Sequence, residues 1–99
     1  MKEGDSMTDL AILPILKMNL GIAGSTWDRY LQALLAVARK EITREGITIN
    51  DSVDDDNLIV MYAAYLFRKR AEDTATMPRM LRYALNNRVI SEKGAVDES

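Results

Sequence analysis

Cysteine and histidine are both absent from this 99-residue sequence. Without a thiol the chain forms no disulfide and offers no thiolate nucleophile, and without imidazole it lacks the commonest general acid–base group. A zinc site built from cysteine and histidine is excluded for the same reason. The lack of cysteine also fits a reducing compartment. These two absences already argue against most classes of enzyme.

Glycine and proline are scarce, with five and two residues, and aromatic residues make up only 6% of the chain. Hydrophobic residues account for 47%, which is ordinary for a globular domain and too much for general disorder. The abundant Ala, Leu, Arg, Lys and Met favour helices over strands. We therefore predict one all-α domain over residues 1–99, a small bundle of about four helices. Residues 1–7 and 93–99 are small and polar, and we expect them to be flexible.

Long apolar runs are missing as well. The longest, Leu58 to Phe67, is about half of the ~20 residues that a membrane-spanning helix needs. The first residues, Met1 to Ser6, are polar and acidic, unlike a signal peptide. We expect no contact with a membrane and a protein that is soluble in the cytosol when it is made.

Hydrophobic periodicity predicts a first helix from about Thr8 to Asn19, with a kink or a late start at Pro14. The second helix follows Ser25-Thr26-Trp27-Asp28, a capping-box pattern in which Asp replaces the usual Glu or Gln. Gly46 is a typical residue to end that helix. Its apolar stripe consists of Trp27, Leu31, Leu34, Leu35, Ala38 and Ile42.

The later part of the chain predicts two more helices. Ile47-Thr48-Ile49 is too short for more than an extended connector or one small strand. The third helix should begin at Ser52 to Asp54, where carboxylates favour the positive end of the helix dipole. From Leu58 to Phe67 this helix is apolar on every side, so other helices or a neighbouring subunit must cover it. Pro78 suits the first turn of a fourth helix, which we expect to end near Ser91.

The net charge of −2 hides a segregation of charge along the chain. Asp51, Asp54, Asp55 and Asp56 form an acidic block. An excess of positive charge follows in Arg68, Lys69, Arg70, Arg79, Arg82 and Arg88. A molecule with separate acidic and basic regions can complement copies of itself, although two solvated helix ends would give the same pattern.

The residues that could carry chemistry do not assemble into a known kind of site. Consecutive aspartates do not point to one place on a helix, and the spacing and glycine of a calcium-binding loop are missing, so capping and solvation explain the acidic block. Gly21 and Gly24 follow no phosphate-binding pattern, and Ser25 has no histidine to activate it. We predict that the protein is not an enzyme and needs no metal or cofactor.

The basic residues leave two interpretations open. Arginines with Tyr83 among them can meet phosphates, but they can equally pair with carboxylates of adjacent subunits or make the surface soluble. The linker before Pro78 resembles the turn of a helix-turn-helix, yet Leu81, Ala84 and Leu85 fill much of the following helix, where a polar recognition surface would be expected. The aromatic residues Trp27, Tyr62 and Tyr65 are more typical of core or interface anchors than of ligand stackers.

Over about Thr8 to Ser91, the chain resembles the small head–tail connector (adaptor) proteins of long-tailed bacteriophages. The resemblance depends on the order and spacing of segments that are individually common. They are a leucine-rich first helix (Leu10 to Leu20), an Asp-led second helix (Trp27 to Arg39), an aromatic third helix that ends in arginine (Met61 to Arg70), and the proline-started Met77-Pro78-Arg79-Met80-Leu81-Arg82-Tyr83. Pro14 departs from this pattern.

The resemblance implies a structural protein without catalytic activity. Such subunits form a ring of about twelve or thirteen copies between the portal and the tail-completion or head-closure proteins of the virion, with double-stranded DNA passing through without sequence-specific contacts. A closed ring needs two different complementary surfaces on each subunit. As candidates for core or subunit interfaces we take Trp27, Tyr62, Tyr65, Phe67, Asp54, Asp55 and Asp56. As candidates for contacts with subunits, portal or DNA we take Arg68, Lys69, Arg70, Arg79, Arg82 and Arg88.

Two other functions compete with this one. A small helical DNA-binding module would use the same arginines on phosphates, and its affinity would fall steeply with salt. A subunit of an unrelated helical assembly is the third possibility. A connector should bind short duplexes weakly or not at all.

Overall fold

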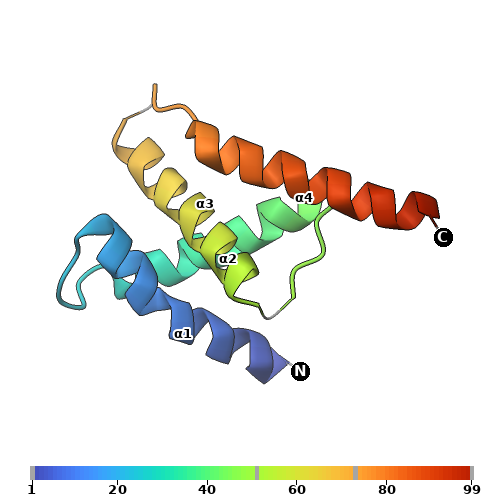
Figure 1. Cartoon of the computed structure of the whole chain (residues 1–99). Helices are drawn as coiled ribbons and strands as arrows, with labels where there is room; N and C mark the ends of the chain where they lie inside the picture. Colours follow the sequence, from blue (N-terminus) through green and yellow to red (C-terminus); the bar gives the residue numbers. More distant parts are fainter. Residues whose placement is uncertain (1, 51, 73, 99) are drawn as a thin grey trace.

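The computed structural model contains four helices: α1 (Lys2–Leu20), α2 (Asp28–Arg44), α3 (Val53–Ala71) and α4 (Arg79–Glu98) (Figure 1). It describes the backbone of residues 2–50, 52–72 and 74–98, and the side chains of residues 11–93 except 51 and 73. No β-strand occurs within these backbone ranges. The predicted all-α fold with four helices is therefore confirmed.

The four helices form a flattened body with principal extents of 47 × 36 × 18 Å. Helix α3 is central: it packs against α1, α2 and α4, and α1 also packs against α2. Figure 1 shows α1 and α4 on opposite sides of the body. The outward faces of α1 and α4 are therefore two separate surfaces of the chain.

Helix α1 is longer than predicted, because it begins at Lys2 rather than near Thr8. The helix runs through Gly4, Asp5 and Ser6, which are weak helix formers, and Pro14 does not delay its start. Pro14 is exposed, so the carbonyl group that loses its hydrogen bond to the missing N–H lies on the side of the helix that water can reach. The side chains of residues 1–10 and 94–99, which include most of the predicted flexible ends, lie outside the described residues.

Helix α2 confirms the predicted apolar stripe but not the predicted cap. Leu31, Leu35 and Ile42 are fully buried, whereas Trp27 occupies the N-cap position without any side-chain capping hydrogen bond. Asp28 instead forms an ion pair with Lys17 of α1, with 2.8 Å between Nζ and Oδ1. The acidic side chain therefore links two helices rather than capping one. Gly46 follows the helix end with φ of 101°, a conformation that favours glycine.

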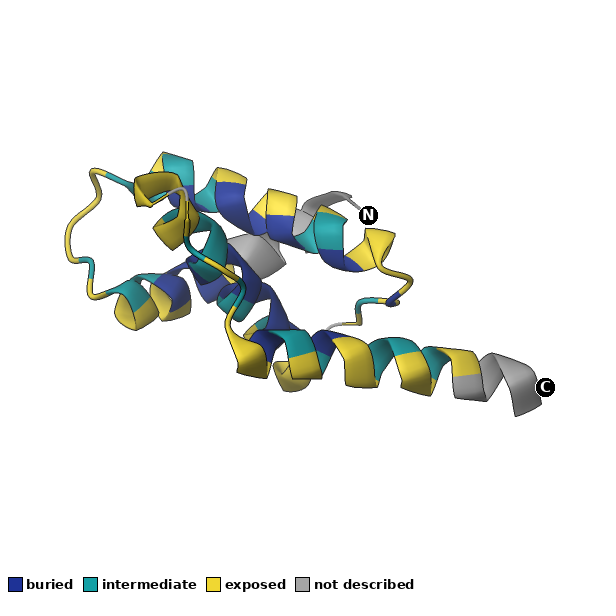
Figure 2. Ribbon diagram, turned by 90° about the horizontal axis from the view of Figure 1, so that it is seen from above, coloured by how far each residue is buried: buried dark blue, intermediate teal, exposed yellow. Residues whose placement is uncertain are grey.

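Helix α3 begins where predicted, because the hydroxyl of its N-cap residue Ser52 accepts a hydrogen bond from the Asp55 N–H at 3.2 Å. The segment that is apolar on every side is covered mainly by the other helices of its own chain (Figure 2). Its buried residues are Leu58, Ile59, Val60, Tyr62, Ala63 and Ala64. Its half-buried residues Met61, Tyr65, Leu66 and Phe67 pack against the core. One chain thus supplies most of the cover that this helix requires.

Helix α4 follows the linker that ends at Pro78, whose carbonyl accepts a hydrogen bond from the Arg82 N–H at 3.0 Å. Leu81 and Leu85 are buried, as the apolar spacing predicts. The helix runs to Glu98 and is longer than predicted, because it continues through Gly94 instead of ending near Ser91. Beyond its contact with α3 it extends past the body (Figure 1).

Candidate interaction surfaces

A network of charged and polar groups fixes α4 to the start of α3 and the connector before it. Asp55 is only 2% exposed. Its carboxylate accepts hydrogen bonds from the Arg88 guanidinium and, at 2.5 Å, from the Asn50 N–H. Arg88 also donates to the Thr48 carbonyl at 2.9 Å, and Glu92 accepts from the Thr48 N–H at 3.1 Å. We call Thr48, Asn50, Asp55, Arg88 and Glu92 the polar clamp.

The clamp explains how a carboxylate is tolerated inside so small a protein. A buried charge is costly unless it is paired and hydrogen-bonded, and both oxygens of Asp55 have a donor. The hydrogen bond to Asp55 raises the pKa of the Arg88 guanidinium further above its ordinary value. Asp55 and Arg88 were both candidates for contacts with other molecules. The structure pairs them with each other, so Asp55 and Arg88 serve the internal packing of the chain.

The outward face of α4 carries three large apolar side chains among polar ones. Met80 is 75% exposed, Tyr83 58% and Ile90 66%. These three residues, which we call the outer stripe of α4, lie within one third of the helix circumference, opposite the buried Leu81 and Leu85. Large apolar side chains that gather on one exposed face are typical of protein–protein contacts. Their helical spacing is present in the sequence, but the arginines of the same helix, rather than these three residues, were predicted to make contacts.

The outward face of α1 is the second exposed apolar surface. Ile15 is exposed, and Met18 one turn later is 80% exposed. Beside Met18 lies a shallow hollow, which Leu13, Pro14 and Ile22 also line. Because α1 and α4 lie on opposite sides of the body, this surface is different from the outer stripe of α4 (Figure 1).

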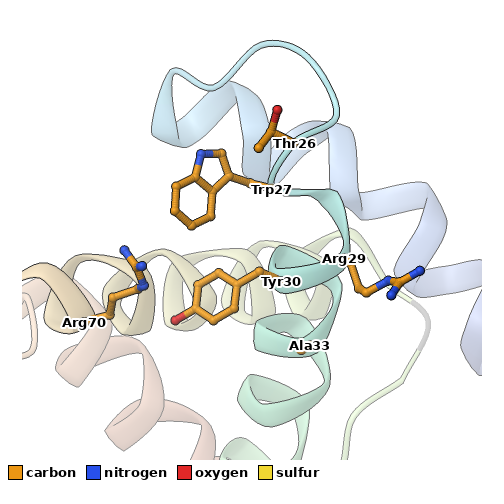
Figure 3. A pocket seen from close by; sticks show the side chains of 6 residues that line it. All are labelled: Thr26, Trp27, Arg29, Tyr30, Ala33 and Arg70. Atoms are coloured by element: carbon orange, nitrogen blue, oxygen red, sulfur yellow. The ribbon is translucent and has the colours of Figure 1, made fainter.

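Three aromatic residues gather where α2 begins and α3 ends. The rings of Trp27 and Phe67 meet edge to face with centroids 5.7 Å apart, and Tyr30 lies 5.9 Å from Trp27. The Arg70 guanidinium carbon stands 4.9 Å from the Trp27 ring centroid and 5.3 Å from that of Tyr30. Figure 3 shows Arg70 beside the two rings and Arg29 pointing away on the other side of α2. We call the surface lined by Thr26, Trp27, Arg29, Tyr30, Ala33 and Arg70 the aromatic hollow.

The other aromatic candidates lie in or beside the core. Tyr62 is buried, and its ring meets that of Tyr65 edge to face at 6.0 Å. Burial, followed by the nearby Glu41 and Glu45 carboxylates, raises the pKa of Tyr62 above its ordinary value of 10.0. Tyr62 is thus a core residue, whereas Trp27, Tyr65 and Phe67 are half-buried. The prediction that a second subunit covers these three side chains stays a prediction.

Most of the basic candidates have partners within the chain. Arg82 forms an ion pair with Glu45 across 3.8 Å, and Arg68 donates to the Asn19 side chain at 3.4 Å. Lys69 lies over the Tyr65 ring, with 5.9 Å from Nζ to the centroid. Arg79 is exposed and has no partner among the described residues. The six basic residues therefore do not form one continuous face of free cations.

The acidic block is divided in the same way. Asp54 is exposed at the start of α3, Asp56 is half-buried, and Asp55 belongs to the polar clamp. Among the described residues no group of three acidic side chains is placed to hold a metal ion. None of the described helices combines the length and apolar composition needed to cross a membrane.

Comparisons of the chain with protein-family models, curated proteins and solved structures gave no match. The resemblance to connector proteins therefore stays a prediction from the sequence. What the geometry adds is a pair of separate surfaces with exposed apolar residues, one on α1 and one on α4.

Proposed function

We propose that the protein is a structural subunit of a ring at the head–tail junction of a long-tailed bacteriophage. The observation that supports this proposal best is the outer stripe of α4, with Met80, Tyr83 and Ile90 exposed on a helix whose opposite face is fixed to the body. A helix held in this way presents its apolar side chains at a defined angle. Such a surface suits assembly with another protein.

The exposed Ile15 and Met18 of α1 provide the second surface that a ring requires. A ring closes through head-to-tail contacts, in which one patch of a subunit meets a different patch of the next. In the proposed assembly about twelve or thirteen subunits stack between the portal and the tail-completion or head-closure proteins, around the path of the DNA. The protein acts without catalysis or cofactor and resides in the virion after assembly in the host cytoplasm.

The alternative function, a small DNA-binding module, is less well supported by the side chains. Arg82 and Arg88 form ion pairs with carboxylates of their own chain, and Arg70 is stacked on two aromatic rings. Each of these contacts competes with phosphate binding. Of the arginines on α4, Arg79 alone among the described residues lacks a partner in the chain. We therefore favour protein assembly over nucleic-acid recognition.

Native mass spectrometry over a concentration series, with electron microscopy of any large species, tests the proposal. We expect a closed ring of about a dozen copies. The variant Tyr83→Glu should abolish it by placing a charge on the outer stripe, whereas Asn86→Glu, an exposed position outside the stripe on the same helix, should leave it intact. A chain that stays monomeric at all concentrations contradicts self-closure. Salt-dependent binding to short duplexes would then favour the DNA-binding function.

A further inference from the structure

Several cations gather at one end of the molecule. At one end the α1–α2 loop, the start of α2 and the end of α3 come together (Figure 1). This end carries the cations Arg29, Arg68, Lys69 and Arg70. Asp28 nearby is already paired with Lys17, and Glu72 follows α3. Among the described residues at this end the cations therefore exceed the carboxylates, and we call it the loop end.

The aromatic hollow lies at the loop end. The Arg70 guanidinium lies over the rings of Trp27 and Tyr30, and such cation–π contacts leave hydrogen-bond donors for a further acceptor. Within the described residues neither Arg70 nor Arg29 pairs with a carboxylate. Trp, Tyr and Arg beside one another on a surface are the residues that most often dominate binding energy at interfaces. The hollow therefore suits an occupant that is partly apolar and negatively charged.

The chain carries such a segment at its other end. Helix α4 runs away from the loop end and extends past the body (Figure 1). Residues 94–99 read Gly-Ala-Val-Asp-Glu-Ser, with two small apolar residues followed directly by two carboxylates. Since this segment and the hollow lie at opposite ends of the molecule, the contact joins two copies rather than folding back within one chain.

We infer that the aromatic hollow of one copy binds the acidic C-terminal segment, residues 94–99, of a second copy. The apolar Ala95 and Val96 suit the rings, and the adjacent carboxylates of Asp97 and Glu98 suit the Arg70 guanidinium. The contact is head to tail, so each copy donates one segment and receives another. The inference depends on the proposed self-assembly and assigns one of its contacts.

The location of the hollow is compatible with the apolar surfaces already described. The shallow hollow beside Met18 on α1 is lined in part by Asp28. The next residues on either side, Trp27 and Arg29, line the aromatic hollow. The two hollows therefore adjoin each other at the loop end. An α4 helix that packs its outer stripe along a neighbouring α1 can thus carry its C-terminal segment to the aromatic hollow. One helix would then supply both the apolar and the acidic part of the contact.

Because the chain lacks cysteine, disulfide cross-linking gives a clean test. The double variant Thr26→Cys/Glu98→Cys places one thiol at the rim of the hollow and one in the segment. Under mild oxidation we expect a ladder of covalent multimers on a non-reducing gel. The matched control Thr43→Cys/Glu98→Cys, with its exposed first position near the other end of α2, should give at most a weak dimer band.

Native mass spectrometry of the same samples distinguishes failure of the proposed ring from failure of the contact between the aromatic hollow and residues 94–99. Large assemblies without a ladder, or with equal ladders in variant and control, would overturn the assignment of the hollow and leave the proposed ring untouched. Monomers without a ladder at the highest concentration would overturn both.

Charge reversal provides an independent readout. Arg70→Glu should lower the fraction of assembled protein at least tenfold, and the added changes Asp97→Arg and Glu98→Arg should restore it by exchanging the two signs. Arg44→Glu, which changes an exposed arginine at the end of α2 far from the aromatic hollow, should have no such effect. Failure of the rescue in variants that remain folded by circular dichroism would contradict the contact. Assembly that Arg70→Glu leaves unchanged while Asp54→Arg abolishes it would point instead to the acidic start of α3.

Discussion

Helices α1, α2 and α3 are held together differently from α4. The three-helix body is joined by fully buried apolar side chains, among them Leu16, Leu35 and Ile59. Among its described side chains, helix α4 contributes Leu81 and Leu85 to the buried core, and it is fixed in addition by the polar clamp. Apolar contacts are not directional, whereas hydrogen bonds set an angle. The comparison indicates that the body supplies stability and the clamp supplies orientation, which keeps the outer stripe facing outward.

The largest effect is expected in the body. Leu35→Ala removes a side chain with no solvent exposure and leaves a cavity between α2 and its neighbours. We expect the free energy of unfolding to fall by about 2–5 kcal/mol, as measured by urea denaturation. Val37→Ala on the exposed side of the same helix is the control, with a loss below about 0.5 kcal/mol. Similar losses in both variants would show that the core does not lie where we describe it.

A smaller but more local effect is expected in the clamp. Asp55→Ala leaves Arg88 without its carboxylate partner, and since the Arg88 side chain is partly exposed, water offsets some of the cost. We expect a loss of about 1–3 kcal/mol. Hydrogen exchange should accelerate in α4 and much less in α2. Asp54→Ala, at the exposed neighbouring position, should change both quantities less, because it loses only the interaction of a carboxylate with the helix dipole. Uniform acceleration over all four helices would refute the separate role of the clamp.

Alkaline pH should weaken the body through Tyr62. Because burial and two nearby carboxylates raise the pKa of this phenol in the folded state, the unfolded chain loses the proton first as the pH rises. Stability contributed by the neutral phenol is therefore complete below the unfolded pKa of about 10 and is lost as the pH rises toward the higher folded pKa. Urea midpoints measured across this range should fall, and Tyr62→Phe should reduce the fall. An unchanged slope in Tyr62→Phe would exclude Tyr62 as the cause.

The smallest effect is expected for the second ion pair of α4. Arg82 and Glu45 are both partly exposed and 3.8 Å apart, so Arg82→Gln should cost less than about 0.5 kcal/mol in thermal or urea unfolding. Arg88→Gln, in the clamp, should cost clearly more. Equal costs would mean that the buried carboxylate contributes no more than a surface contact does.

Local sequence patterns predicted the elements better than the contacts between them. The all-apolar Leu58 to Phe67 and the stop at Gly46 follow from side-chain size and backbone freedom, which act within a few residues. The pairing of Asp55 with Arg88 joins positions 33 residues apart and depends on how α4 lies on α3. A run of aspartates does not reveal which one will be buried, so the sequence did not distinguish Asp55 from Asp54 and Asp56.

The missed cap and the missed surface have related causes. Asp28 fits a capping pattern, but Lys17 of another helix offers it a nearby opposite charge. Met80, Tyr83 and Ile90 have helical spacing, yet the spacing alone does not say which of several faces of α4 points outward. Only the position of Leu81 and Leu85 in the core decides that. The aromatic hollow likewise needs α2 and α3 side by side.

The two most exposed large hydrophobic residues on the described surface are both methionines, Met18 on α1 and Met80 on α4. Oxidants convert an accessible thioether into a polar sulfoxide, which would make either surface less apolar. In the proposed assembly, Met18 and Met80 should therefore oxidise faster in the free chain than in a chain whose apolar surfaces are covered. Brief peroxide treatment before and after assembly, followed by peptide mass spectrometry, would turn these two sulfur atoms into built-in reporters of which surface has been covered.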